Sequence, residues 1–186
     1  MDKRLARREL FARIRSLTLE ERAGYSALVC EFLKQDQAFL DAGFVFSFLS
    51  LPGEPDLSQL VSAFPEKRWA FSRVTSEGTL AFHEMSDPSE ALPGDHGIRE
   101  PDLAKHREIG PLDADYFLVP GVGFDPVSHA RLGRGRGHYD RYLSLARERS
   151  VPATLVGVAF STQFLTIEPE PHDIPMDRVI SELGWS

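Results

Sequence analysis

Residues 115–143 read "DYFLVPGVGFDPVSHARLGRGRGHYDRYL", and they join one apolar run to a second apolar pattern through a glycine-rich stretch. The opening "DYFLVPG" is typical of a buried strand. After the glycines, Tyr139, Tyr142 and Leu143 recur at helical spacing. A buried strand that leads through a loop into a helix is the repeating unit of α/β proteins, so this stretch predicts an α/β fold.

Further apolar runs on both sides of this unit extend the predicted sheet. Residues 68–74 and 79–85 flank a Ser-Glu-Gly turn, which is typical of a β-hairpin. The other runs of strand type are "FVFSFLSL" at 44–51, "TLVGVAF" at 154–160 and the shorter "RVISE" at 178–182. Because these runs alternate with helical patterns, we expect an α/β sandwich with a mostly parallel central sheet and an additional β-hairpin.

Two helices are predicted before the first of these strands. Apolar residues between Leu10 and Leu17 follow helical spacing and leave the arginines of the segment on its outer face. Thr18 and Glu21 then form the capping-box pattern, which predicts the start of a second helix that ends before Gly43.

The segment between the first and the central strand is less regular. Asp56 can cap a short helix that runs through residue 64. Residues 86–114 contain four prolines and little periodicity, so we expect them to form a long surface connection.

The composition is that of one ordinary folded domain. The chain has 186 residues, of which 42% are hydrophobic and 26% charged, and these values are near the averages for globular proteins. We therefore expect a single domain over residues 1–186. The one cysteine, Cys30, cannot form an internal disulfide and lies among apolar residues, which indicates a buried thiol in a reducing compartment.

The sequence gives no indication of a membrane or export segment. No apolar run is long enough to cross a bilayer, and the basic N-terminus is not followed by the apolar stretch of a secretory signal. Acidic residues such as Asp2 and Glu9 argue against an organellar presequence. We expect a cytoplasmic monomer without a membrane partner.

Positive charge is concentrated at two places in a chain that is acidic overall. The formal net charge is −7, which disfavours binding to nucleic acid. Residues 1–15 nevertheless hold six of the 21 basic residues, and residues 131–141 hold four. Such a local concentration of positive charge suits a small anionic ligand, and phosphate is the natural candidate.

The glycine-rich stretch has the position and composition of a phosphate-binding loop. It lies between a predicted strand and a helix, where backbone N–H groups, the helix N-terminus and arginines can all face an anion. Gly133, Gly135 and Gly137 are each separated by one residue, so neither the Walker A spacing nor the dinucleotide fingerprint is present. A plain structural turn is an alternative, and so is RNA binding, because Arg-Gly alternation also occurs in RNA-binding tails.

Carboxylates near this stretch could hold a divalent cation. Asp140 follows the last glycine by three residues and could bind Mg²⁺ beside phosphate oxygens, or it could pair with Arg141 or cap the helix. Near the C-terminus, "PHDIPMD" offers His172, Asp173 and Asp177, and one of these carboxylates could be a second ligand. The spacings of zinc sites and the G-x-S-x-G nucleophile motif are absent.

"LVPGVGFD" followed by "RLGRGRGHYDRYL" closely resembles the signature of the 5-formyltetrahydrofolate cyclo-ligases, also called 5,10-methenyltetrahydrofolate synthetases. The similarity extends over nearly the whole chain and through several separated motifs in the same order. These are Lys3 and Arg7 in the first helix, "FLSLPGE" ending in Glu54, the Arg73 strand, "GIREP", and "HD" with a later Asp at residues 172–177. The resemblance implies a three-layer α/β/α sandwich, which agrees with the pattern of predicted elements.

The resemblance also implies an ATP- and Mg²⁺-dependent ligase that acts on a small molecule. In this family 5-formyltetrahydrofolate is cyclised to 5,10-methenyltetrahydrofolate, with release of ADP and phosphate. The formyl oxygen attacks the γ-phosphate of ATP, N10 of the folate adds to the activated carbon, and phosphate departs. Such a reaction needs positioning and charge neutralisation more than a protein nucleophile, which fits a sequence without a catalytic triad.

The roles of the family's residues can be placed on the matching positions of this sequence. The residues expected at ATP are Lys3, Arg7, Arg131, Gly133, Arg134, Gly135, Arg136, Gly137, His138, Tyr139 and Asp140. Those expected at the folate are Leu49, Glu54, His138 and Tyr139, with Glu54 on the pterin. Asp140 and Asp173 are expected to face Mg²⁺, and Arg134, Arg136 and Tyr139 to be catalytic. From the residues alone, Lys3 and Arg7 could equally form a solvated helix face, and Glu54 a turn.

Three positions depart from the family pattern. His138 stands where the first of two tyrosines is usual, and it introduces a pH-sensitive group. The spacer at 126–130 is one residue longer than usual and lacks a glycine, and Ser72 replaces a common proline. None of the three removes an expected charge.

Two other functions are compatible with the same residues. A paralogue could keep the ATP site and act on another small substrate, and a catalytically silent protein could bind folate or nucleic acid. The presence of Lys3, Glu54 and Asp140 favours the cyclo-ligase over the silent protein.

Overall fold

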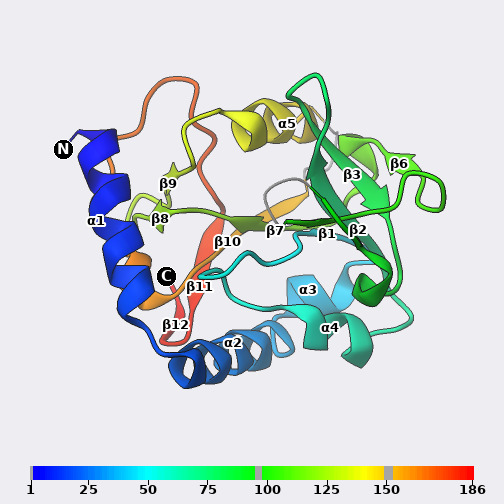
Figure 1. Ribbon diagram of the computed structural model, residues 1–186, viewed down its shortest axis with the longest axis horizontal. Coiled ribbons are helices and arrows are strands. Elements are labelled where there is room, and N and C mark those ends of the chain that lie inside the picture. The colour runs from blue at the N-terminus through cyan, green and yellow to red at the C-terminus, as the bar shows by residue number, and fades with distance from the viewer. Residues whose placement is uncertain (1, 95–97, 149–152) are drawn as a thin grey trace.

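A sheet of eight strands forms the centre of the computed structural model, which describes residues 2–94, 98–148 and 153–186 (Figure 1). The strand order is β12-β11-β10-β7-β1-β2-β3-β6. The strands are β1 (Phe44–Ser47), β2 (Arg68–Val74), β3 (Leu80–Glu84), β4 (Leu92–Pro93), β5 (Arg99–Glu100), β6 (Glu108–Ile109), β7 (Tyr116–Pro120), β8 (Gly123–Phe124), β9 (Arg131–Leu132), β10 (Thr154–Val158), β11 (Arg178–Ser181) and β12 (Gly184–Trp185). The helices are α1 (Lys3–Ser16), α2 (Leu19–Leu33), α3 (Gln37–Asp41), α4 (Ser58–Ala63) and α5 (His138–Ala146), with 3-10 turns η1 (Pro88–Glu90), η3 (Pro111–Asp113) and η4 (Ser161–Gln163).

The middle of the sheet is parallel. β1 pairs in parallel with β2 and β7, and β10 pairs in parallel with β7 and β11. Antiparallel pairs lie toward the edges, where β2 pairs with β3, β3 with β6, and β11 with β12. The predicted mostly parallel sheet is confirmed. The predicted hairpin, β2–β3, is continuous with this sheet because β2 also pairs with β1.

Helices cover both faces of the sheet, which gives the expected three layers. Figure 1 shows α2, α3 and α4 on one face and α5 on the other. The side chains of β7 alternate between the two cores: Tyr116 and Leu118 pack on the side of α2 to α4, and Phe117 and Val119 on the side of α5. All four are fully buried, as the continuous apolar pattern of this strand predicts.

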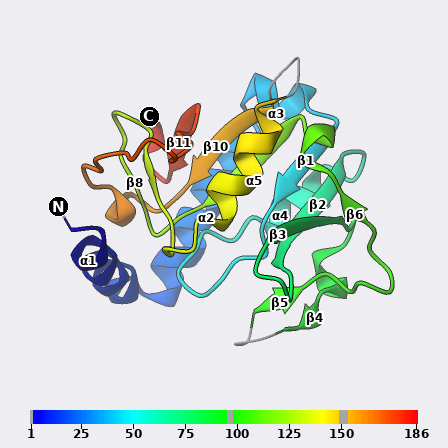
Figure 2. The ribbon, with the colours of Figure 1, turned by 90° about the horizontal axis from the view of Figure 1, so that it is seen from above.

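α1 lies beside the sheet and not on either face (Figures 1 and 2). Its buried residues Ala6 and Leu10 form a small separate core with Val122, Leu132 and Ile167. This packing places the N-terminal turn of α1 next to the segment that follows β9, which is the glycine-rich stretch.

Several local predictions are confirmed. The Thr18 backbone N–H donates to Glu21 Oε2 at 2.7 Å and the Glu21 N–H to Thr18 Oγ1 at 3.1 Å, so the capping box is present. The short helix after Asp56 is present as α4; Asp56 Oδ1 accepts from the Ser58 N–H at 2.9 Å, but the N-cap residue is Leu57 and not Asp56. Cys30 is fully buried. No helix in the described ranges is long and apolar enough to span a membrane.

Two regions differ from expectation. The second helix, expected to end just before Gly43, ends at Leu33, and a separate short helix, α3, follows it. The five residues of α3 are too few to show periodicity; Asp36 caps its N-terminus and Phe39 is fully buried. Residues 86–114 are more ordered than a surface connection, since β4 pairs with β5 and β6 joins the main sheet. Residues 95–97, which include the glycine of "GIREP", lie outside the described part of the chain.

Candidate active site

A cleft of about 660 Å³ opens beyond the carboxyl ends of β1, β2 and β7. Ligands of open α/β sheets bind at this edge, because the strand ends and the loops that follow them converge there. The cleft is lined by the glycine-rich stretch, by the segment from Phe48 to Glu54, by the end of β2 with the turn that follows it, and by β5. The predicted residues Leu49, Glu54, Arg134, Arg136, His138 and Tyr139 are all among its lining residues.

The glycine-rich stretch, residues 133–137, is called the glycine loop below. Gly135 and Gly137 have φ angles of 98° and 64°, in the left-handed region that favours glycine. Gly137 is also the residue that precedes the first turn of α5. The loop therefore turns sharply and leads into a helix N-terminus, which is the arrangement predicted for binding an anion.

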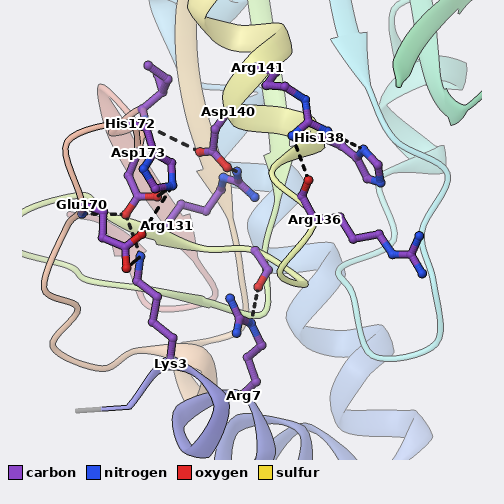
Figure 3. A network of polar contacts seen from close by, with 12 residues as sticks. Lys3, Arg7, Arg131, Arg136, His138, Asp140, Arg141, Glu170, His172 and Asp173 are labelled. Carbon is purple, nitrogen blue, oxygen red and sulfur yellow. Dashed lines mark hydrogen bonds and ion pairs between the residues drawn. The ribbon is translucent and has the colours of Figure 1, made fainter. Parts of the chain in front are cut away.

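Arg7 connects the first helix to the glycine loop. Its Nε donates to the carbonyl oxygen of Gly133 at 2.7 Å across 126 residues of sequence (Figure 3). A Cβ atom on Gly135 would lie 3.4 Å from the Arg7 guanidinium carbon. Arg7 therefore faces the loop and is not part of a solvated helix face.

A buried ion pair fixes Asp140. Arg131, whose side chain is 4% exposed, donates from its terminal Nη2 to Asp140 Oδ2 at 2.8 Å. Arg141, the partner considered for Asp140 from the sequence, instead donates to the Arg136 carbonyl and to His138 Nδ1. Because Arg131 is buried, its charge depends on Asp140 for compensation.

Lys3 makes a second cluster with acidic residues of the segment before β11. Its Nζ lies 2.9 Å from Asp173 Oδ2 and 3.2 Å from Glu170 Oε1 (Figure 3). Burial opposes the charge on Lys3, but the hydrogen bonds to Asp173 and Glu170 outweigh it and raise the pKa of this lysine. Burial likewise opposes the charge on Asp173, and the Glu170 N–H with the Lys3 ammonium lowers its pKa below the usual value.

The two predicted metal ligands lie in neighbouring positions. The N–H of Ile174, next to Asp173 in sequence, points at Asp140 Oδ1 at 3.5 Å. Glu170, His172 and Asp173 also offer ligand atoms that all lie within 4.8 Å of one another. Carboxylate oxygens beside a phosphate-binding loop are the donor set that Mg²⁺ prefers, so these residues fit that ion.

Glu54 is buried at the other side of the glycine loop. Its Oε2 accepts from the Leu51 N–H at 3.0 Å and its Oε1 pairs with Arg134 Nη2 at 3.3 Å, with 10% of its side chain exposed. Burial raises the pKa of Glu54, and the Leu51 N–H and the Arg134 charge oppose that effect only in part. Arg134 thus links the glycine loop to the position predicted for the pterin.

Tyr139 and His138 lie at the start of α5. The Tyr139 hydroxyl donates to Ser72 Oγ at 3.0 Å, and the Arg131 guanidinium lies 5.4 Å from the centre of the Tyr139 ring. Burial raises the pKa of Tyr139, which keeps the hydroxyl protonated. Burial and then the charges of Arg141 and Arg136 lower the pKa of His138, so its imidazole is neutral near pH 7.

Two side-chain contacts of the site were not predicted from the sequence. Ser72, noted only as a departure from the family pattern, is the hydrogen-bond partner of Tyr139. Arg73 and Glu100, noted only within family motifs, pair across the cleft lining at 3.1 Å. Both contacts join strands to segments far away in sequence, and no local pattern signals such a pair.

Comparison with known proteins identifies the family. The model of the 5-formyltetrahydrofolate cyclo-ligase family matches residues 1–182. A 5-formyltetrahydrofolate cyclo-ligase of Mus musculus is 28% identical, over 97% of this chain and 93% of its own length. The one of Mycolicibacterium smegmatis is 37% identical over 50% of this chain and 47% of its own length.

Solved structures agree with this match. The 5,10-methenyltetrahydrofolate synthetase of Aquifex aeolicus has a TM-score of 0.82 and 32% identity, and the alignment covers 100% of this chain and 92% of that one. The synthetase of Mycoplasma pneumoniae, at 20% identity, shares the fold with a TM-score of 0.79 over 98% of this chain and 99% of its own. Since the family model extends over nearly all of the sequence, the chain belongs to the 5-formyltetrahydrofolate cyclo-ligase family.

Proposed function

We propose that the cleft beside the glycine loop is where this protein cyclises 5-formyltetrahydrofolate to 5,10-methenyltetrahydrofolate, with conversion of ATP to ADP and phosphate. One observation supports this most directly. Lys3, Arg7 and the glycine loop meet carboxylates at one end of the site, and buried Glu54 lies on the other side of Arg134. A phosphate-binding end and a pterin-binding end are therefore joined by one side chain.

The reaction needs a phosphoryl group to be held in line with the formyl oxygen of the substrate. That oxygen attacks the γ-phosphorus, the bond to ADP breaks, N10 then bonds to the formyl carbon and loses its proton, and phosphate leaves with the oxygen. The chain contributes position and charge: the N–H groups of the glycine loop, the exposed guanidinium groups of Arg134 and Arg136, and Lys3 and Arg7 from α1. Tyr139, held by Ser72, keeps the start of α5 in place beside the reacting groups.

Asp140 and Asp173 would hold Mg²⁺. The ion would supply charge neutralisation on the phosphate oxygens when bound. Arg131 orients Asp140, and Lys3 balances the charge of Asp173, so both carboxylates are held beside the loop by a cationic partner.

Glu54 would bind the pterin. An ionised carboxylate accepts hydrogen bonds from the N–H groups of a pterin ring, and the Leu51 N–H fixes the orientation of this one. Leu49, His138 and Tyr139 would complete the walls of the folate site.

We also propose that residues 1–186 act as one domain and as a cytoplasmic monomer. The described part of the chain contributes both the cleft and the neighbouring groups around Lys3 and Arg7 by itself, and a single buried thiol suits a reducing compartment. Light scattering of the purified protein with and without ATP tests the monomer.

The direct test is turnover. Purified protein with ATP, Mg²⁺ and 5-formyltetrahydrofolate is expected to produce methenyltetrahydrofolate, which is followed by its near-ultraviolet absorbance. Bound ATP without product would indicate a paralogue with another substrate, and tight RNA binding without ATP binding would indicate a nucleic-acid protein.

The proposed metal site has its own test in Asp140→Asn. This variant should require at least tenfold more Mg²⁺ for half-maximal rate, because a neutral amide is a weak ligand. Asp177→Asn is the matched control, since Asp177 pairs with Arg147 at 2.7 Å outside the site. An unchanged Mg²⁺ requirement in Asp140→Asn would place the ion elsewhere.

A further inference from the structure

Arg73 lies on the cleft lining away from the glycine loop. It is on β2, two residues after Phe71, which pairs with Ser47 at the end of β1. Its guanidinium Nη2 pairs with Glu100 Oε2 of β5 at 3.1 Å, and the two side chains are 20% and 19% exposed. Both residues line the cleft.

The pairing with Glu100 does not use the whole guanidinium. Among the described residues, the Nε of Arg73 is buried and has no hydrogen-bond partner. A buried donor without a partner is unfavourable. Because this Nε is buried, a substrate carboxylate would meet the part of the Arg73 side chain that is exposed at the cleft lining, beside Glu100 or in its place.

The other arginines that line the cleft either have a hydrogen-bond partner or are proposed to bind phosphate. Arg99 donates from Nη2 to the carbonyl oxygens of Ser89 and Ala91 at 2.9 and 2.7 Å. Arg131 is paired with Asp140, and Arg134 with Glu54. Arg136 is exposed on the glycine loop, among the groups proposed for phosphate.

The direction of Arg73 follows from strand alternation. Ser72 points toward α5, because its hydroxyl receives the hydrogen bond of Tyr139. Its neighbour Arg73 therefore projects to the opposite face. That is the face on which Phe71 packs in the same core as Leu49, on the side of the segment that ends in Glu54.

We infer that Arg73 binds a carboxylate of the glutamate portion of the folate substrate. This inference rests on the proposed function, because a pterin held by Glu54 leaves the glutamate as the part of the substrate that carries negative charge. Arginine binds carboxylates through two parallel hydrogen bonds. Glu100 holds the guanidinium at the cleft lining when no substrate is present.

The test compares two substrates in one variant. Arg73→Gln should raise the KM for 5-formyltetrahydrofolate about tenfold, or about 1.4 kcal/mol, and leave the KM for ATP unchanged, since the variant loses a charge-assisted hydrogen bond to the glutamate. The N-methylamide of 5-formyltetrahydropteroate keeps the pterin and the benzoyl group but has neither glutamate carboxylate nor benzoate charge. Its KM should be the same in the wild-type protein and in Arg73→Gln.

Arg68→Gln is the matched control on the same strand. Arg68 pairs with Glu84 at 2.7 Å and stacks over Phe44, outside the residues that line the cleft. This variant should show wild-type KM values for both substrates. Its unfolding temperature and that of Arg73→Gln would be measured alongside.

The outcomes separate the inference from the proposed function. An equal rise in KM for the full substrate and for the analogue would mean that Arg73 acts on the pterin or through the fold, and would overturn its role at the glutamate. A wild-type protein that makes no product from either compound would overturn the proposed function and this inference with it.

Discussion

At the scale of single residues, the site depends on charges that are held partly out of water. Glu54 and Arg131 show the two ways in which this is done. Arg131 is paired with one carboxylate in a buried position, so its charge is compensated. Glu54 is buried with an exposed arginine as its partner, so its charge is compensated only in part and its pKa is raised. A carboxylate of this kind is sensitive to pH and to its neighbours.

Glu54 gives the first prediction at this scale. Since its pKa lies above 4.5, the KM for 5-formyltetrahydrofolate should rise as pH falls through that raised pKa, because protonation removes the negative charge of the carboxylate and turns one of its two acceptor oxygens into a donor. Arg134→Ala removes a charge that lowers this pKa, so the rise should begin at a higher pH. Steady-state kinetics at a series of pH values measures both effects.

Two comparisons make the pH prediction specific. Glu54→Gln should lose the pH dependence of the folate KM in this range. Arg136→Ala changes the same loop without removing the partner of Glu54. The pH at which the folate KM begins to rise should therefore stay the same, even if the rate falls. An equal change of this pH in Arg136→Ala and Arg134→Ala would contradict the pairing of Arg134 with Glu54.

At the scale of elements, the loop between β9 and α5 is shaped by glycine conformation and by contact with α1. Gly135 combines the two, because its φ is 98° and a Cβ there would lie 3.4 Å from the Arg7 guanidinium carbon. An L-residue is strained in this backbone conformation whatever space is available. The loop that the phosphates would meet is therefore formed before any ligand arrives.

Gly135→Ala is the prediction that belongs to this element. It should weaken ATP binding about tenfold, because the loop must shift to relieve strain of about 1–2 kcal/mol. Gly24→Ala is a suitable control: nothing lies within 4 Å of a Cβ at Gly24 in α2, and alanine favours the helix. Calorimetric titration with ATP measures both variants, and equal affinities would show that the loop tolerates a side chain.

Elements were predicted well where a local pattern exists and poorly where it does not. The strand of residues 116–120 and the capping box at Thr18 are local, and both are present. α3 and β4 to β6 are too short to show a period, and they form because packing and pairing elsewhere stabilise them. The contact of Lys3 with Asp173 spans 170 residues, so only resemblance to a family could place the two together.

At the scale of the whole molecule, stability in acid depends on a few paired carboxylates. Glu84, on β3, accepts from Arg68 and Arg107 on the neighbouring strand and segment. The Arg68 guanidinium, with help from Arg107 and against partial burial, lowers the pKa of Glu84 from 4.5 to about 2. This cluster joins the antiparallel edge of the sheet to its parallel centre, because β2 pairs with both β1 and β3.

The sign of the resulting pH dependence follows from that lowered pKa. The contribution of Glu84 to the free energy of unfolding should be complete above pH 4.5 and lost as pH falls toward about 2. Allowing for solvent screening, we expect about 1–2 kcal/mol. Glu84→Gln should reduce the loss of unfolding free energy between pH 4.5 and about 2, measured by urea unfolding. Glu31→Gln is the control, because Glu31 pairs with Lys34 on the exposed face of α2, and it should leave this loss unchanged. Identical losses in the two variants would contradict the prediction.

The packing of α1 beside the glycine loop affects how the protein is made. The end of the site proposed to bind phosphates combines Lys3 and Arg7 with the loop and with Asp173, so a ribosome must synthesise the chain from Lys3 through Asp173 before these groups can meet. A growing polypeptide that lacks residue 173 cannot use ATP to stabilise its partly formed sheet. On this proposal, the core must hold together through its own apolar packing until residue 173 has been made, and nucleotide can stabilise the fold only after that point.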